Sequence, residues 1–186
     1  MHNPELHSLA AVSWQYFCTL TFKSEKNMRF GPAMFISLVR LQAQCFGVHF
    51  KKVLWVVRHE KGTVGGRPHF HAVIAGLPPS AGSRNCFAIK SQWERLGGGM
   101  ARISEYISTL DGLDYILKGA ELTESTVRRW AGDYHELSKF GDSCEVTLSE
   151  SVARLLCNRQ RDGWRGVFGS RDEGDRHYHP AQREAQ

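Results

Sequence analysis

The segment RPHFHAVIAG, residues 67–76, carries the pattern that decides the fold of this protein. Its apolar and β-branched residues predict a strand. Side chains alternate between the two faces of a strand, so His69 and His71 share one face. Phe70 and Ala72 lie on the other face, which we expect to pack inward. The strand is therefore expected to contribute to the core on one side and to carry two imidazoles on the other.

A second strand is predicted just before it, over residues 48–60 (VHFKKVLWVVRHE), and a glycine-rich turn, KGTVGG, joins the two. This arrangement predicts a β-hairpin. Neighbouring strands lie about 4.8 Å apart, so a carboxylate at Glu60 can reach a metal held by His69 and His71. His59 points to the opposite face from Glu60. At most one of the two is therefore expected to join the histidines.

Further elements are predicted around this hairpin from hydrophobic periodicity, turn residues and helix-end signals. They are a strand over residues 14–22, a helix over 30–47, a helix over 83–99, a strand over 100–107 and a helix over 108–120. In the helix over 83–99 we expect four inward side chains: Phe87, Ile89, Trp93 and Leu96. The order β-α-β-β-α-β is the split βαβ, ferredoxin-like order. We predict an α+β fold with a mostly antiparallel sheet and helices packed on one face.

The composition indicates one ordinary domain with a real core. The chain has 186 residues, 41% of them hydrophobic, with a net charge of +5 and a pI near 9.1. This charge permits an anionic partner such as nucleic acid, although many other proteins are as basic. Five separated cysteines without a C-x-x-C pair argue against a disulfide framework or a zinc cluster. With no leader-like N-terminus and no long apolar run, we expect a cytoplasmic protein that does not span a membrane.

A third group of candidate residues lies in DYILK, residues 114–118. Tyr115 and Lys118 are three positions apart, hence on one face of the predicted helix. Tyrosine can act as a covalent nucleophile, but its ordinary pKa near 10 means that it needs activation. A nearby metal and a lysine ammonium would supply that help. Each feature alone has a plainer explanation: a surface histidine beside a core one, a solvated glutamate, or an amphipathic helix.

Together and in this order, the motifs resemble those of the HUH endonucleases, in particular the single-tyrosine rolling-circle replication initiators, or Rep proteins. FCTLTF (residues 17–22) is similar to the first family motif, RPHFHAVI (67–74) to the second and YILK (115–118) to the third. An acidic residue about nine positions before the first histidine, here Glu60, is a further family feature. The resemblance covers roughly residues 14–120.

The resemblance implies a nicking enzyme. His69, His71 and Glu60 would hold Mg²⁺ or Mn²⁺, which would polarise a phosphodiester of single-stranded DNA at a replication origin. Tyr115 would attack and form a 5′-phosphotyrosine link, releasing a 3′-hydroxyl for a polymerase. Lys118 would steady the phosphate or favour the tyrosinate. A later strand transfer could then reseal the DNA without ATP.

Basic residues near the motifs are candidates for phosphate contacts. Those expected to surround the site are Arg67, Lys51, Lys52, Arg58, Lys61, Arg84 and Lys90. Arg67 is the strongest candidate because it directly precedes the strand with the two histidines.

The resemblance also suggests how the chain is divided. We expect an HUH endonuclease domain over residues 1–122, a C-terminal helical extension over 123–157 and a polar, mobile tail over 158–186. Helices are expected within the extension over 124–140 and from residue 149 to 160. No G-x-x-x-x-G-K-[ST] loop occurs in the sequence, so any unwinding would come from a helicase in trans or from supercoiling, and a polymerase would also act in trans. In a eukaryotic virus the compartment would be the host nucleus.

Two other functions remain open from the sequence. HUH transposases and conjugative relaxases share the metal and tyrosine chemistry, but relaxases are usually larger and add a third histidine. A catalytically inactive single-strand binder is the other alternative, since nucleic-acid-binding modules often use such sheets. The intact histidines, glutamate and tyrosine argue against an inactive site.

Overall fold

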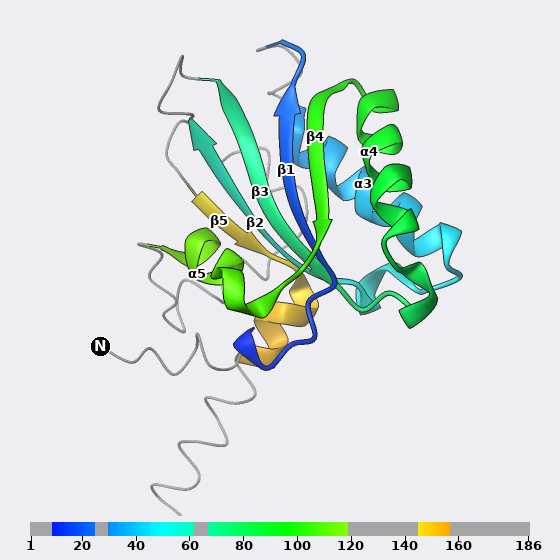
Figure 1. Ribbon diagram of the computed structural model, residues 1–186, viewed down its shortest axis with the longest axis vertical. Coiled ribbons are helices and arrows are strands. Elements are labelled where there is room, and N and C mark those ends of the chain that lie inside the picture. Colours follow the sequence, from blue (N-terminus) through cyan, green and yellow to red (C-terminus); the bar gives the residue numbers. More distant parts are fainter. Residues whose placement is uncertain (1–8, 25–29, 62–66, 119–144, 157–186) are drawn as a thin grey trace, which may run out of the picture.

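A five-stranded antiparallel sheet forms the centre of the computed structural model, which describes residues 9–24, 30–61, 67–118 and 145–156 (Figure 1). The spatial order is β4-β1-β3-β2-β5, and each neighbouring pair is antiparallel. The strands are β1 (Tyr16–Phe22), β2 (Leu54–Lys61), β3 (Pro68–Ala75), β4 (Gly98–Glu105) and β5 (Glu145–Leu148). The predicted α+β fold with an antiparallel sheet is confirmed.

Two long helices, α3 (Gly31–Cys45) and α4 (Arg84–Arg95), cover one face of this sheet (Figure 1). Proline in the first turn of α3 suits a helix start, because its missing N–H has no helical partner there. In α4, Ile89 and Trp93 are buried, but Phe87 is 76% exposed, so the expectation that Phe87 points inward is wrong. Two residues rotate a helix by about 200°, which turns Phe87 away from the side on which Ile89 is buried.

The sheet separates two hydrophobic clusters. Beneath α3 and α4 lie Trp55, Phe70 and Ala72, so the inward face predicted for β3 is confirmed. The other face of β3 contributes Val73 to a second cluster. That cluster includes residues of α5 (Gly112–Leu117) and of a helical segment over residues 150–156. Helices therefore flank both faces, and the expectation of helices on one face was too narrow.

Strand β5 was not predicted, and it pairs with β2 at the edge of the sheet. Directly after it, the hydroxyl of Ser149 accepts hydrogen bonds from the backbone N–H groups of Val152 and Trp55, each at 3.3 Å. The first of these bonds caps the helical segment. Residues 145–156, assigned by sequence to the C-terminal extension, thus complete the same sheet and core. The helix expected over 124–140 and the tail over 158–186 lie outside the described residues.

Three shorter elements connect the main ones. They are the 3₁₀ turns η1 (Phe50–Lys52), η2 (Pro79–Ala81) and η3 (Ser108–Leu110). Turn η3 precedes α5, and Asp111 occupies the N-cap position in the left-handed region with φ of 50°. The side chain of Asp111 makes no capping hydrogen bond. Among the described residues no helix is long and apolar enough to cross a membrane.

Candidate metal centre

The β2–β3 hairpin brings three possible metal ligands onto one face of the sheet. Glu60 lies directly opposite His69 in the register, and Arg58 lies opposite His71. Because side chains alternate along each strand, all four of these residues point away from α3 and α4. His59, between Arg58 and Glu60, points the other way and packs edge-on against a core phenylalanine ring at 5.1 Å. Glu60 is therefore the residue that joins the histidines.

The three ligand atoms form a compact group. Glu60 Oε2 is 3.7 Å from His69 Nε2 and 3.7 Å from His71 Nε2, and all three atoms lie within 4.8 Å of one another. The three side chains are only 13–17% exposed. Two imidazole nitrogens and a carboxylate oxygen are a common donor set for divalent cations. The cluster can therefore hold a metal ion.

Hydrogen bonds behind the rings orient them for this role. His69 Nδ1 lies 3.1 Å from the Arg67 carbonyl oxygen, which can only accept, so Nδ1 carries the proton. The lone pair of His69 is then on Nε2, the nitrogen that faces Glu60. His71 Nδ1 lies 3.1 Å from Thr19 Oγ1 in the neighbouring strand. Both rings thus present Nε2 to the centre of the cluster.

The electrostatics favour the metal-binding forms of the ligands. Burial opposes the charge of Glu60, but the hydrogen bond from Tyr115 and the charges of Arg58 and the histidines outweigh it and lower the pKa of Glu60. Burial and the neighbouring His69 lower the pKa of His71, although Glu60 acts in the opposite direction. At neutral pH, Glu60 is therefore a carboxylate and His71 a neutral imidazole.

Tyr115 lies at the edge of this cluster. Leu113, Ile116 and Leu117 anchor α5 to the second hydrophobic cluster, while Tyr115 stays 45% exposed. Its hydroxyl donates a hydrogen bond of 2.8 Å to Glu60 Oε2, and its ring meets the His71 ring edge-on at 5.1 Å. The phenol therefore touches two of the three candidate ligands.

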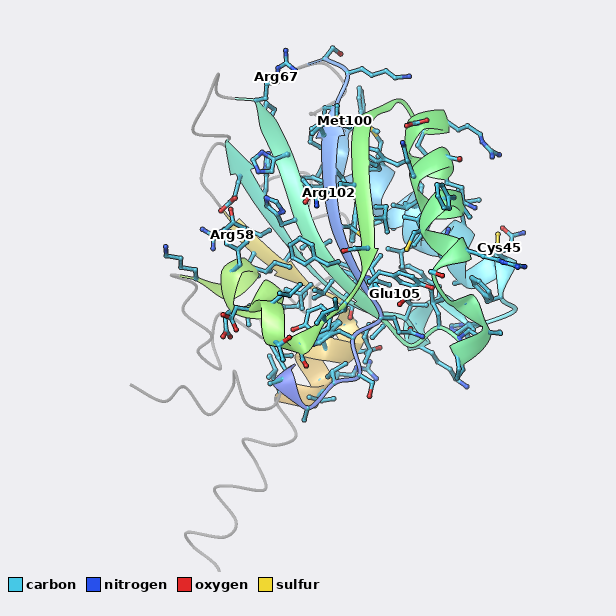
Figure 2. The ribbon with its side chains drawn as sticks, viewed as in Figure 1. Cys45, Arg58, Arg67, Met100, Arg102 and Glu105 are labelled. Atoms are coloured by element: carbon cyan, nitrogen blue, oxygen red, sulfur yellow. The ribbon has the colours of Figure 1, made fainter. Side chains whose placement is uncertain are left out.

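Arg58 links the cluster to α5, a role that the sequence interpretation did not assign. Its Nε lies 2.7 Å from Glu60 Oε1, and Nη1 donates to the carbonyls of Ile116 and Lys118 (Figure 2). The side chain is only 14% exposed. Arg58 was a candidate DNA contact, but its guanidinium is engaged within the protein. The two-residue spacing from Glu60 was the signal that could have suggested this pairing.

The spacing predicted that Lys118 and Tyr115 share one face of a helix, and this prediction is wrong. Helix α5 ends at Leu117, and Lys118 occupies the C-cap position with a non-helical ψ of 119°. The bond from Arg58 to the Lys118 carbonyl holds the chain where it leaves the helix. Lys118 is exposed.

Arg67 and Lys61 lie at the end of the hairpin that carries the cluster. Arg67 is exposed and directly precedes β3, and Figure 2 shows it at that end of the strand. Lys61 is the last residue of β2 and pairs with Pro68. Their positions place both backbones beside Glu60 and His69.

The remaining basic candidates do not surround the cluster. Lys51 and Lys52 belong to η1, before β2, and the Lys51 ammonium lies 3.9 Å from Glu150. At about 3.3 Å per residue, the length of β2 separates them from Glu60 by roughly 20 Å. Arg84 and Lys90 belong to α4, across the sheet. The prediction that these four basic residues surround the site is therefore wrong. The length of β2 separates Lys51 and Lys52 from Glu60, and the sheet lies between α4 and the cluster.

No protein-family model, no curated protein and no solved structure matches this chain. The function is therefore inferred from the site itself.

Proposed function

We propose that this protein is a metal-dependent endonuclease and strand transferase that nicks single-stranded DNA with Tyr115, in the manner of the Rep-type HUH endonucleases it resembles. One observation carries the proposal. The phenolic oxygen of Tyr115 lies 2.8 Å from Glu60 Oε2, the same oxygen that lies 3.7 Å from both histidine nitrogens. A tyrosine hydroxyl within one hydrogen bond of a set of metal ligands is suited to attack a phosphate that the metal polarises.

The donor set fits a divalent cation, with Mn²⁺ or Mg²⁺ proposed. Glu60, His69 and His71 would hold the ion, which would polarise a phosphate oxygen and offset the charge that develops there. The contact between His71 Nδ1 and Thr19 Oγ1 and the hydrogen bond from His69 Nδ1 to the Arg67 carbonyl keep the imidazoles in place.

Tyr115 supplies the nucleophile. Its hydroxyl oxygen forms a bond to phosphorus while the bond from phosphorus to the 3′ oxygen breaks. The phenolic proton passes to solvent water, because Glu60 stays a carboxylate as a metal ligand, and the departing 3′ oxygen takes up a proton from water to become a hydroxyl. The products are a 5′-phosphotyrosine and a free 3′ end. Because one phosphodiester replaces another, the reverse step can join a 3′-hydroxyl to the bound strand without ATP.

The proposed substrate is single-stranded DNA at a replication origin, and the proposed role is initiation of rolling-circle replication. The net charge of +5 and the exposed Arg67 beside the cluster support an anionic substrate. A polymerase would extend the 3′-hydroxyl, and a helicase would act in trans, in the cytoplasm or in a host nucleus. An inactive single-strand binder would have no need for a tyrosine hydroxyl bonded to the ligand set.

A random-sequence single-stranded DNA library labelled at its 3′ end tests this proposal. With Mn²⁺ the protein should form a labelled adduct that survives denaturant, because the 5′-phosphotyrosine retains the 3′ part of the strand. Tyr115→Phe, which removes only the hydroxyl, should abolish the adduct, and so should EDTA.

A library labelled at its 5′ end is the matched control. It should yield a free, shortened strand that a polymerase extends, and no labelled adduct. An adduct formed by Tyr115→Phe would place the nucleophile elsewhere. An adduct that keeps the 5′ label would reverse the polarity of the link.

A further inference from the structure

A pocket of about 240 Å³ lies beside the candidate metal centre, between β1, β4 and the connection from β4 to α5. Its lining includes Phe17, Thr19, Arg102, Ser104, Ile107 and Leu110. Figure 2 shows Arg102 on the sheet face that α3 does not cover. Pockets for drug-sized ligands usually measure about 300–1,000 Å³, so this one suits a smaller group.

Strand register connects the pocket to the metal centre. Thr19 in β1 lies opposite His71 on one side and opposite Arg102 on the other. Two strand spacings therefore separate Arg102 from His71, about 10 Å along the sheet. Thr19 also contacts His71 Nδ1 at 3.1 Å, and the Phe17 ring stacks on the His71 ring at 5.8 Å. The pocket and the candidate metal centre therefore share a wall.

The lining combines flat apolar surface with one cation. Ile107 and Leu110 are 53% and 71% exposed, unusually open for large apolar side chains. Arg102 and Ser104 point to the face of β4 that lines the pocket. Because side chains alternate along a strand, the side chain of Glu105 points to the other face. Largely apolar walls suit a base better than a phosphate, and an arginine can stack on a base or bond its edge.

We propose that this pocket receives one unpaired nucleobase of the DNA strand, adjacent to the nucleotide at the metal centre, and that Arg102 holds that base. This inference rests on the proposed function. It assigns Arg102 and Ser104 to substrate binding and leaves the cleavage step to Tyr115 and the metal ligands.

Binding measured in EDTA tests the pocket independently of cleavage. Fluorescence anisotropy compares labelled oligo(dA) with an oligomer of the same length whose sugars carry no bases. The wild-type protein should prefer oligo(dA) by about tenfold, since stacking of one base contributes roughly 5- to 150-fold in affinity. Arg102→Ala, which removes the cation, and Ser104→Leu, which fills the pocket, should each reduce the preference to about twofold or less.

Matched substitutions on the opposite side of the sheet serve as controls. Arg84→Ala and Ser91→Leu change exposed residues of α4 and should keep the preference for oligo(dA). Arg102 and Ser104 are exposed, and circular dichroism melts should show unchanged folding. A preference that persists in both pocket variants, or wild-type binding that ignores the bases, would overturn the pocket assignment alone. Absence of any binding to single-stranded DNA would overturn the proposed function as well.

Discussion

Tyr115 and Glu60 are 55 positions apart in sequence, yet the tyrosine hydroxyl donates a hydrogen bond of 2.8 Å to the glutamate carboxylate. The bond joins α5 to the end of β2 and ends on the oxygen that faces both histidines. It places the tyrosine hydroxyl, the proposed nucleophile, at the candidate metal centre. The contacts around it lead to four predictions.

Thr19→Val should weaken Mn²⁺ binding by roughly tenfold, because hydrogen bonds behind a ligand typically change metal affinity by about 10–100-fold. The substitution removes the hydroxyl that contacts His71 Nδ1. Isothermal titration calorimetry with Mn²⁺ measures the change. Thr21→Val is the matched control, since the Thr21 hydroxyl donates to the Met100 carbonyl and not to a ligand. Equal losses in the two variants would show that the Thr19 contact has no special role.

Mn²⁺ should bind more tightly than Mg²⁺, because two of the three donors are imidazoles, which suit transition metals better than magnesium. At equal concentrations, Mn²⁺ should therefore raise the melting temperature more, as a ligand of the folded state does. His71→Ala should remove both shifts. A larger shift with Mg²⁺, or one that persists in His71→Ala, would place the metal elsewhere.

Metal affinity should be nearly constant above pH 7 and fall at acidic pH. Protons compete with the metal for Glu60 and His71. The lowered pKa values of His71 and Glu60 keep these two groups in their binding forms below the ordinary histidine value of about 6.5. Mn²⁺ titrations at several pH values from 5 to 8 measure this fall in metal affinity. Affinity that rose as the pH fell would contradict the ligand assignment.

Arg58→Met should lower the free energy of unfolding by about 2 kcal/mol, since hydrogen bonds that involve a charged group contribute about 1.5–3 kcal/mol. The change breaks the ion pair with Glu60 and the bonds to the end of α5. Urea unfolding measures the loss. Arg102→Met, at an exposed position in the same row of the sheet, should have little effect. A similar small effect for Arg58→Met would mean that the link to α5 adds little stability.

Several features of the fold follow from local patterns. The alternation in HFH assigned Phe70 to the core and the histidines to the opposite face, because successive strand residues always point to opposite sides. The same rule separated Glu60 from His59. The four-residue strand β5 escaped prediction, since a short edge strand has too few residues to show a period. Phe87 was predicted to be buried because it is hydrophobic, yet it is exposed. Hydrophobicity alone does not reveal which side of a helix faces the core.

The sequence by itself determined which residues share a face of each strand, and its ordered motifs indicated the kind of chemistry. Only the tertiary structure decided which of those residues meet. It set Glu60 opposite His69, brought Tyr115 to Glu60, engaged Arg58 with α5 and left Lys51 at the far end of the hairpin. The physical reason is that a strand or helix period depends on neighbouring residues, whereas register and packing depend on the burial of the whole core.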